Sequence, residues 1–510
     1  MAKPKIEVKR TFQRGAQLVE SLPHTGDMPL AGAFVDPNIS KEHVLLSGRT
    51  GAGKTQVLLP LLDYITNKVQ RTNNTIAIVT DISGEFTSKF YNPETDYILN
   101  PFDERSQKWN PFAEIEDASD CAMLAEALVE RSGDSQARQW EMFAERIISD
   151  SLNALHYSAD FKLKDQIQIL FRILGFQEPE FAAEVLKGTQ SEGYFKKGNE
   201  TFLGSVSQVA SGSIRGLSTL EQSGNFSLRK WLTDAVNGTE KRKVLWIPYM
   251  PKDRPALKTL IATWLNLLVL QVLSLTPDRT RQIFVVMDEL DSLGKVERLK
   301  DALTLGRKYG LSTIAAIQTL SQLKDTYGEN DSKTLIGNFS SKIVLAQADF
   351  DTADYFSKTL GSYEEKLNIQ KVSTSSGSSS SGGSSNRSMD VNENMDRNIL
   401  LVTPTQLTAL EKLTGYALLA GMSTNGIQNV LKFKLNVTDL EQISEPFVKR
   451  GEPVKETAID TTKKVAKRFL PKDIIELTPQ KTEAIAKIVY MTIATAIIGA
   501  AATLIYILMT

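Results

Sequence analysis

The chain has 510 residues, of which 41% are hydrophobic and 23% charged, and this composition excludes a disordered protein. Because one hydrophobic core rarely serves a chain of this length, we expect two or three domains. A single cysteine, Cys121, excludes an internal disulfide framework, and three widely spaced histidines give no zinc site. The formal net charge of −1 neither supports nor excludes nucleic acid as a partner.

A glycine-rich segment between a short apolar run and a helical pattern is the first motif in the chain. It consists of Gly48, Arg49, Thr50, Gly51, Ala52, Gly53, Lys54 and Thr55. The run His43–Ser47 before it predicts a strand, and Gln56–Leu62 after it predicts a helix. Strand, glycine-rich loop and helix in this order are the context of a phosphate-binding loop. The alternative is a glycine-rich turn with an isolated lysine.

The residue types of this loop suit a nucleoside triphosphate. Glycines let successive backbone N–H groups point at one anion, and the N-terminus of the following helix adds its positive dipole end. Lys54 would reach the β- and γ-phosphates, and the Thr55 hydroxyl would ligate Mg²⁺. The sequence therefore predicts that the chain binds ATP with Mg²⁺.

The strand pattern continues after the loop and is then interrupted. Thr75–Asp81 is short, β-branched and nearly all apolar, which predicts a buried strand, and Tyr97–Leu99 predicts a brief one. From Ala118 to Lys230 the apolar residues follow helical spacing, so we expect an all-α insertion. Strand character returns at Val244–Pro248.

The segment Thr259–Leu275 is so apolar that it competes as a membrane span. It is short for a span, contains Asn266 and Gln271, and lies between two predicted strands. We therefore interpret it as a helix that other elements of the fold cover.

Four further strands complete the predicted sheet. They are Gln282–Met287, Ser312–Ile317, Lys342–Ala346 and Gly415–Ala420, and a helix is expected from the first of them to Lys308. Alternating strands and helices imply an α/β fold with a mainly parallel sheet covered on both faces. Residues 373–388 are almost entirely Ser and Gly, which predicts a solvated loop or, alternatively, a mobile loop that contacts a partner.

Two acidic residues, Asp288 and Glu289, follow the strand Gln282–Met287. Ligands of open α/β sheets bind at the carboxyl ends of the strands. Asp288 is therefore predicted to hold the Mg²⁺ shell, and Glu289 to orient and polarise the attacking water. The alternative is an acidic strand end that caps the following helix.

Gln318 and Arg307 are each open to two interpretations. Gln318 ends the strand next to Asp288, where its amide either senses the γ-phosphate or is structural. Arg307 ends a predicted helix, where it either caps the last carbonyls or projects into a neighbouring subunit as an arginine finger. The spacing alone favours the cap.

The C-terminal run Ile488–Met509 has 22 residues without a charge, which is long enough to span a bilayer. Seven basic residues precede it between Lys463 and Lys487, so the preceding domain is expected in the cytoplasm. The alternative is a buried core or oligomerisation helix.

The chain resembles the coupling proteins of conjugative type IV secretion systems, the TrwB/TraD-like group of hexameric DNA-pumping ATPases related to FtsK and HerA. The resemblance extends from about Arg14 to Leu440. It rests on the stretches His43–Thr55, Val79–Phe86, Ile98–Asp103, Phe226–Leu232, Asp288–Leu293, Leu303–Leu311 and Gln318–Leu323.

The resemblance implies a RecA-like P-loop NTPase fold, DNA-stimulated ATP hydrolysis and assembly into a homo-hexamer. It implies that Arg307 acts in trans and that Gln318 links the γ-phosphate to segments that face the DNA. The implied partners are DNA bound without sequence specificity, as a single plasmid strand attached to a relaxase, together with relaxosome proteins and components of the secretion channel. The all-α domain would engage substrate and relaxosome in the cytoplasm.

We therefore expect a nucleotide-binding domain in two parts, residues 1–117 and 231–455, separated by the all-α domain 118–230. A basic linker, residues 456–487, and an anchor in the inner membrane, residues 488–509, are expected to follow. Family members usually carry their membrane helices ahead of the motor, so a C-terminal anchor is a departure. Two alternative functions are an ATPase that moves protein substrates only and an ATP-binding cargo receptor that does not hydrolyse ATP.

Overall fold

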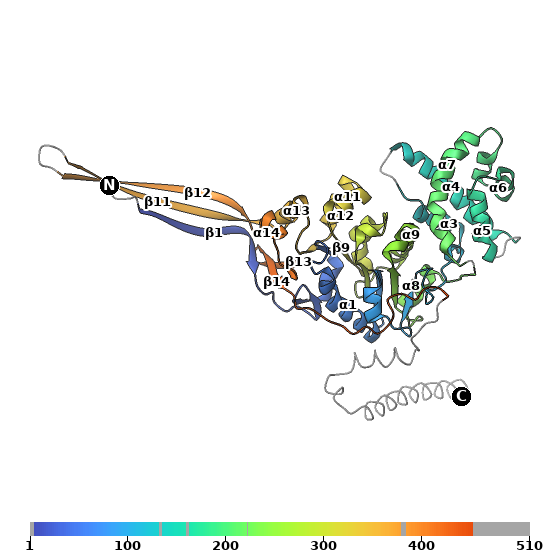
Figure 1. Ribbon diagram of the computed structural model, residues 1–510, viewed down its shortest axis with the longest axis horizontal. Helices are drawn as coiled ribbons and strands as arrows, with labels where there is room; N and C mark the ends of the chain where they lie inside the picture. The colour runs from blue at the N-terminus through green and yellow to red at the C-terminus, as the bar shows by residue number, and fades with distance from the viewer. Residues whose placement is uncertain (1–4, 132–134, 160–162, 222, 379–383, 452–510) are drawn as a thin grey trace, which may run out of the picture. The chain divides into compact units, whose positions relative to one another are not determined.

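Figure 1 shows the computed structural model of the chain, which describes residues 5–131, 135–159, 163–221, 223–378 and 384–451. The predicted basic linker 456–487 and the predicted anchor Ile488–Met509 lie outside the described residues. The phosphate-binding loop and all predicted strands lie within them.

Twelve strands of the described part form one mixed sheet in the order β12-β11-β1-β14-β13-β10-β4-β9-β8-β5-β7-β6. The parallel part consists of β10 (Ser341–Val344), β4 (Val44–Ser47), β9 (Leu311–Ile317), β8 (Gln282–Met287), β5 (Thr75–Ile82), β7 (Val244–Tyr249) and β6 (Asp96–Ile98). Beyond β10 lie β13 (Thr414–Thr424), β14 (Ile427–Lys434), β1 (Lys5–Val19), β11 (Ser362–Ser378) and β12 (Ser384–Leu400), where only β14 and β1 pair in parallel. A separate hairpin joins β2 (Met28–Leu30) and β3 (Ala33–Val35). The predicted α/β fold with a mainly parallel sheet is confirmed.

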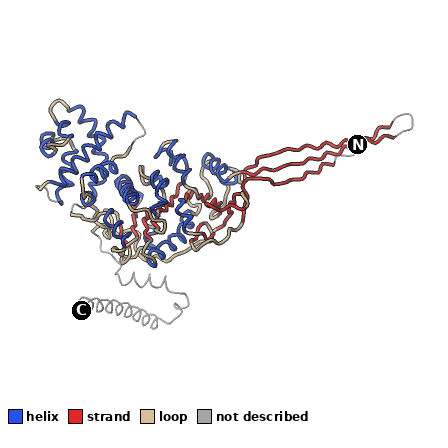
Figure 2. The backbone as a smooth tube through the Cα atoms, turned by 180° about the vertical axis from the view of Figure 1, so that it is seen from behind, coloured by secondary structure: helices blue, strands red, loops and turns tan. Residues whose placement is uncertain are grey.

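Helices cover both faces of the parallel strands (Figure 2). The helices are α1 (Lys54–Arg71), α2 (Glu85–Phe90), α3 (Ala118–Leu128), α4 (Ser135–Tyr157), α5 (Leu163–Leu174), α6 (Pro179–Val185), α7 (Glu200–Ile214), α8 (Leu228–Asn237), α9 (Arg254–Ser274), α10 (Leu299–Leu305), α11 (Leu320–Tyr327), α12 (Glu329–Asn338), α13 (Phe350–Leu360) and α14 (Pro404–Thr408). Every residue of β8 and β9 is buried, as expected for parallel strands covered on both faces.

The two faces of the sheet contribute to two hydrophobic cores. Phe284 and Val286 of β8 belong to the core that α1 completes. Ile283 and Val285 belong to the core that α9 completes. This alternation follows from the two-residue period of a strand, and it fixes which face of the sheet the phosphate-binding loop and its helix occupy.

Helix α9 contains the apolar segment that competes as a membrane span. Together with the preceding turn it is long and apolar enough to cross a membrane by length and composition, and 67% of its apolar window is buried inside the fold. The two amide side chains noted in the sequence are hydrogen-bonded there: the Asn266 side-chain oxygen accepts from the Arg298 N–H at 3.0 Å, and the Gln271 side-chain amide donates to the Thr233 hydroxyl at 3.0 Å. These contacts agree with the prediction of a covered core helix.

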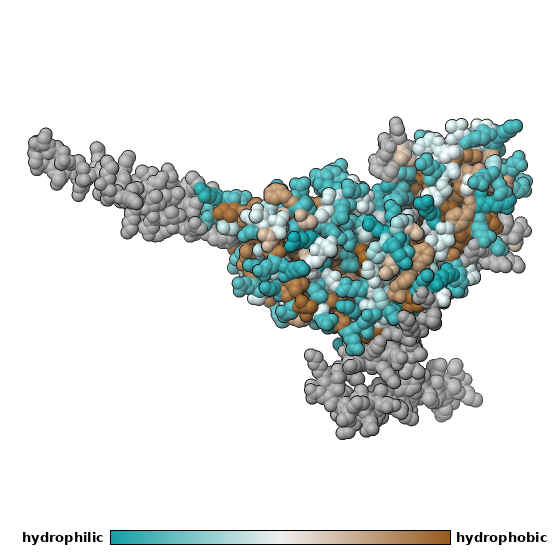
Figure 3. Space-filling model, in the orientation of Figure 1, coloured by the Kyte–Doolittle hydropathy of each residue, from teal (hydrophilic) through white to brown (hydrophobic). Residues whose placement is uncertain are grey.

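The predicted all-α insertion contains no strand among its described residues. Helix α3 begins at a capping box, in which the side chains of Asp117 and Asp120 satisfy backbone N–H groups of the first turn. Helix α3 packs against α4 and also against α9, so the insertion is continuous with the hydrophobic core that α9 completes. On the face seen in Figure 3, apolar residues reach the surface among these helices, and Met142 and Tyr157 of α4 are exposed. The boundaries 118–230 remain a prediction.

The prediction of a loop over residues 373–388 is wrong for most of that segment. Residues 373–378 belong to β11 and residues 384–388 to β12, and the two strands pair antiparallel down to Ser378 opposite Ser384. Strand β1 pairs with the other edge of β11, and the three strands run side by side in Figures 1 and 2. Backbone hydrogen bonds hold a β-ladder together, so the pairing can extend through a Ser-rich sequence. The polar side chains of that sequence are the reason for predicting a loop.

The prediction of a helix that follows Asp288 and Glu289 and extends to Lys308 is also wrong over its first half. A short 3-10 turn at Leu290–Ser292 follows β8, and α10 begins only at Leu299. Gly294 between them has φ 80°, a left-handed conformation that interrupts a helix and that glycine adopts without strain. A second 3-10 turn at Gly306–Tyr309 follows α10.

Candidate functional site

The phosphate-binding loop is anchored to the strands on either side of β4. The N–H of Gly48 donates to the Ile317 carbonyl of β9 at 3.2 Å, and the N–H of Arg49 donates to the Ala346 carbonyl beyond β10 at 2.8 Å. Gly51 and Gly53 have φ 74° and 117°, which non-glycine residues rarely adopt. The loop therefore turns tightly before α1 begins at Lys54.

Lys54 lies folded against the loop. Its Nζ donates to the Gly48 carbonyl oxygen at 2.7 Å. Burial lowers the pKa of Lys54, and the nearby carboxylates of Glu289 and Asp288 oppose that shift. Thr55 is the second residue of α1, at the helix N-terminus that a phosphate would face.

The sheet order brings the predicted site residues to one edge. Strand β9 lies between β4 and β8, and all three run parallel. Asp288 and Glu289 follow β8, Gln318 follows β9, and the phosphate-binding loop follows β4. Because carboxyl ends of parallel strands share one edge, these residues form one site, as the sequence predicts.

Gln318 connects the loop to the acidic pair. Its Nε2 donates to the Glu289 Oε1 at 2.5 Å, and its Oε1 accepts from the Thr50 hydroxyl at 3.0 Å. A change in the position of Thr50 would therefore be transmitted through Gln318 to Glu289. Of the two interpretations of Gln318, this geometry favours the amide that senses the phosphate.

The carboxylates of the site repel one another in a buried setting. Burial, reinforced by the negative charges of Asp81 and Glu289, raises the pKa of Asp288 to about 7. Burial also raises the pKa of Asp291 to about 6, and one oxygen of Asp291 has no hydrogen-bond partner among the described residues. A divalent cation would relieve this repulsion, so the donor chemistry fits Mg²⁺.

The cation would not be held by protein carboxylates alone. Within the described ranges, no three His, Cys, Asp or Glu side chains form a group that could hold a metal ion. Mg²⁺ usually keeps several waters and binds one or two carboxylates plus substrate phosphates. Thr55 and Asp288 suit that pattern, with the remaining ligands supplied by nucleotide and water.

Arg307 lies away from the site of its own chain. It precedes β9, whereas Gln318 follows it, and seven residues of strand separate the two ends by about 20 Å. Its guanidinium forms an ion pair with Glu42 at 2.9 Å, and 66% of the Arg307 side chain is exposed. The structure thus brings Lys54, Asp288, Glu289 and Gln318 together and leaves Arg307 apart.

Sequence reasoning missed Asp81 and Asp291 as members of the site. Asp81 lies at the carboxyl end of β5, one residue before its last residue Ile82, and the rule that selected Asp288 would have selected it too. Asp291 lies two residues beyond Glu289 in a 3-10 turn, where no periodic signal points to it.

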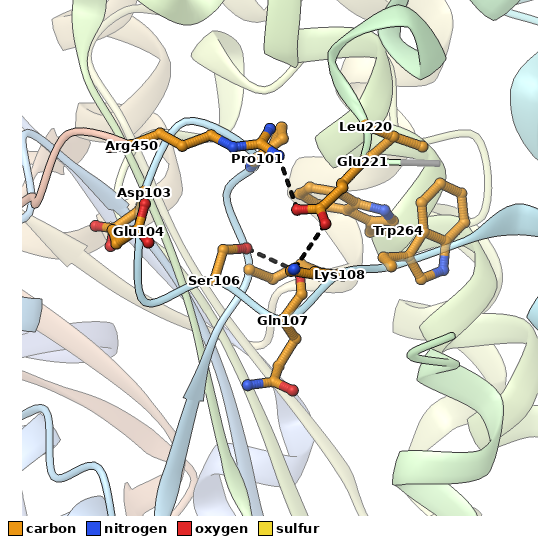
Figure 4. A pocket seen from close by; sticks show the side chains of 12 residues that line it. Pro101, Asp103, Glu104, Ser106, Gln107, Lys108, Leu220, Glu221, Trp264 and Arg450 are labelled. Atoms are coloured by element: carbon orange, nitrogen blue, oxygen red, sulfur yellow. Dashed lines mark hydrogen bonds and ion pairs between the residues drawn. The ribbon is translucent and has the colours of Figure 1, made fainter. Parts of the chain in front are cut away.

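A cavity of about 80 Å³ lies elsewhere, next to the residues that follow β6 (Figure 4). Glu221 at its rim accepts from the Lys108 ammonium at 2.6 Å and from the Arg450 guanidinium at 2.7 Å. None of the residues that line it belongs to the phosphate-binding loop or to the acidic pair. We therefore place the nucleotide site at the loop rather than in this cavity.

Coupling proteins of known name are similar to this chain in sequence. TraD, a coupling protein of Escherichia coli (strain K12), is 24% identical over 400 residues, which cover 78% of this chain and 53% of TraD. VirD4 of Rhizobium rhizogenes is 28% identical over 188 residues, which cover 36% of this chain and 26% of VirD4. The chain thus spans about half the length of TraD and about a quarter of the length of VirD4.

Two solved structures of coupling proteins are also similar to this chain. The unbound bacterial conjugative coupling protein TrwBΔN70 matches with a TM-score of 0.72 and 27% identity, over 86% of this chain and 98% of that chain. The plasmid coupling protein TrwB in complex with ADP and Mg²⁺ matches with a TM-score of 0.72 and 27% identity, over 87% and 98%. The family described as the type IV secretion-system coupling protein DNA-binding domain matches residues 28–430, well over half of the chain. The chain therefore belongs to the family of type IV secretion-system coupling protein DNA-binding domains.

Proposed function

We propose that this chain is an ATPase that translocates DNA and couples a relaxase-bound plasmid strand to a type IV secretion channel. The observation that carries the proposal is the hydrogen-bonded connection from Thr50 of the phosphate-binding loop through Gln318 to Glu289. Such a connection is suited to hydrolysis, because it ties the residue that polarises water to the loop that holds the phosphates. Family membership supplies DNA as the substrate class.

Each residue of the site has a distinct role in this proposal. The Lys54 ammonium, which donates to the Gly48 carbonyl oxygen, would bind the β- and γ-phosphates instead when nucleotide enters the site. Thr55 and Asp288 hold Mg²⁺, which neutralises charge on the phosphates when bound. Glu289 orients and polarises the attacking water, and the Gln318 amide fixes its carboxylate.

Arg307 completes the site of a neighbouring subunit in this proposal. Its distance from Gln318 excludes a direct role in its own chain, and its exposure leaves it accessible to a second copy. The ion pair with Glu42 would hold the guanidinium until the neighbour binds. A ring of six subunits, which the family resemblance implies, would give each site one such arginine.

The remaining partners follow from the family and from the sequence. We propose that the helices between Ala118 and Lys230 engage relaxosome proteins on the cytoplasmic side, and that the chain contacts channel components at the inner membrane. Ile488–Met509, preceded by its basic run, is the proposed single-pass anchor.

ATP hydrolysis measured with and without single-stranded DNA tests the proposal on the full-length chain in detergent. A DNA-translocating motor predicts stimulation by DNA. A protein-directed secretion ATPase predicts hydrolysis that is indifferent to DNA, and an ATP-binding cargo receptor predicts binding without hydrolysis. Either of the last two results would overturn the proposal.

A further inference from the structure

Asp81 is the last residue but one of β5, the strand next to β8, which Asp288 follows. Strands β5 and β8 pair in parallel, with Thr80 opposite Met287 as the last pair of the register. Asp81 follows Thr80 within β5, and Asp288 is the first residue after β8, so continuing the register by one residue brings the two next to each other at the carboxyl edge of the sheet. The side chain of Asp81 is fully buried.

The two oxygens of the Asp81 carboxylate have different surroundings. Oδ2 accepts from the Thr87 N–H at 2.6 Å and from the Thr87 hydroxyl at 2.7 Å. Oδ1 is buried and has no hydrogen-bond partner among the described residues. A buried carboxylate oxygen normally has such a partner, and apart from Thr87 only the backbone N–H of Phe86 lies near this carboxylate as a donor in the described part of the chain, so Oδ1 is open to a further ligand.

The neighbour of Asp81 shows which ligand this is. The register of β5 and β8 puts Asp81 next to Asp288, the residue proposed to hold Mg²⁺. A hydrated Mg²⁺ carries waters whose O–H groups need acceptors, and carboxylates just outside the metal's direct ligands commonly accept them.

We infer that Asp81 is a positioning residue of the cation site, and that its Oδ1 accepts a hydrogen bond from a water bound to the cation that Asp288 holds. This role presupposes the proposed nucleotide and cation site and adds a residue to it. Holding the start of the short helix α2 is the structural role of Asp81, and Oδ2 fulfils that role through Thr87.

The substitution Asp81→Asn separates the two roles. The amide oxygen can still accept from both Thr87 donors, whereas an N–H₂ donor replaces the acceptor Oδ1. The free Mg²⁺ or Mn²⁺ concentration for half-maximal binding of a fluorescent ATP analogue is expected to rise about 10- to 100-fold, as when a group supporting a metal's ligands is lost. Binding of the analogue in EDTA and the Tm of the metal-free chain are expected to change little.

Asp96 in β6 provides a matched control. It is also a buried strand carboxylate, but both of its oxygens have partners: Oδ2 accepts from Trp246 and Asn92 at 2.9 Å each, and Oδ1 accepts from Thr95 at 2.8 Å. Asp96→Asn is therefore expected to lower Tm and to leave the metal dependence as in the wild type.

The possible results are distinguishable. Unchanged metal dependence in Asp81→Asn would overturn the role of Asp81 while the proposed function stands. No metal-dependent nucleotide binding by the wild-type chain would overturn the proposed function itself. If Asp81→Asn does not fold, Thr87→Ala serves instead, because it keeps the carboxylate but removes one of its two tethers. That variant should weaken Mn²⁺ binding several-fold, and an unaltered Mn²⁺ titration would equally refute the inference.

Discussion

Replacing Arg307 with Ala is expected to lower ATP hydrolysis by about 10³-fold or more, the effect of losing an arginine finger, while ATP affinity changes only a few-fold. The physical reason is distance. The seven residues of β9 place Arg307 about 20 Å from Gln318 in the same chain, so on the proposed mechanism its guanidinium stabilises charge at a site of a neighbouring subunit. Nucleotide binding by Lys54 and Thr55 does not involve it.

Stability should hardly respond to this substitution. The Arg307–Glu42 ion pair has an exposed partner, and exposed pairs contribute only about 0 to 1 kcal/mol. Glu42→Gln is the matched control, because it removes the same ion pair and leaves the arginine in place. We expect Glu42→Gln to keep most of the hydrolysis that Arg307→Ala loses.

Mixed oligomers provide the decisive assay. Subunits with Arg307→Ala keep an intact phosphate-binding loop, and subunits with Lys54→Ala keep the arginine, so random mixing restores about a quarter of the interfaces. ATP turnover should therefore reappear in mixtures of two inactive proteins. If no mixing ratio recovers turnover, or if Glu42→Gln is as inactive as Arg307→Ala, the trans role is wrong.

Three further predictions concern the site itself. Lys54→Ala should abolish nucleotide binding and DNA transfer in a mating assay, and normal transfer would contradict the motor. Glu289→Gln should retain binding of the fluorescent analogue while ATP turnover falls about 10²- to 10⁴-fold, and wild-type turnover would place the general base elsewhere. The pKa of Asp288 is raised to about 7, so its folded form holds a proton that the unfolded chain releases near pH 4. Its contribution to the stability of the metal-free chain is therefore lost as pH rises through about 7, and the Tm of Asp288→Asn should fall less than that of the wild type between pH 5 and 8.

The parallel core could be predicted because its strands carry a strong local signal. Strands buried on both faces, such as Gln282–Met287, are short apolar runs bounded by polar residues. Once such strands alternate with helices, the polar residues that follow them must meet at one edge. Asp288, Glu289 and Gln318 could thus be assigned to one site before their contacts were known.

The elements that were mispredicted depend on pairing between distant segments. Strand β11 lies between β1 and β12, and no local pattern in a Ser-rich sequence predicts that pairing. The late start of α10 depends on Gly294, whose left-handed backbone is one of several conformations open to glycine. The distance between Arg307 and the site likewise depends on which strand lies beside which, and spacing in the sequence contains no such information.

The position of β9 in the sheet suggests how neighbouring sites would be coupled. Gln318 at the carboxyl end of β9 contacts the loop and the acidic pair of its own chain. Arg307 precedes the amino end of the same strand and, on the proposed mechanism, reaches the site of the next subunit. Since every residue of β9 is buried in a close-packed core, the strand is expected to move as a rigid unit rather than to bend. A displacement of Gln318 on hydrolysis would then shift β9 as a unit and move Arg307 relative to the adjacent site. Sequential ATP hydrolysis around a ring of subunits requires coupling of this kind between neighbouring sites.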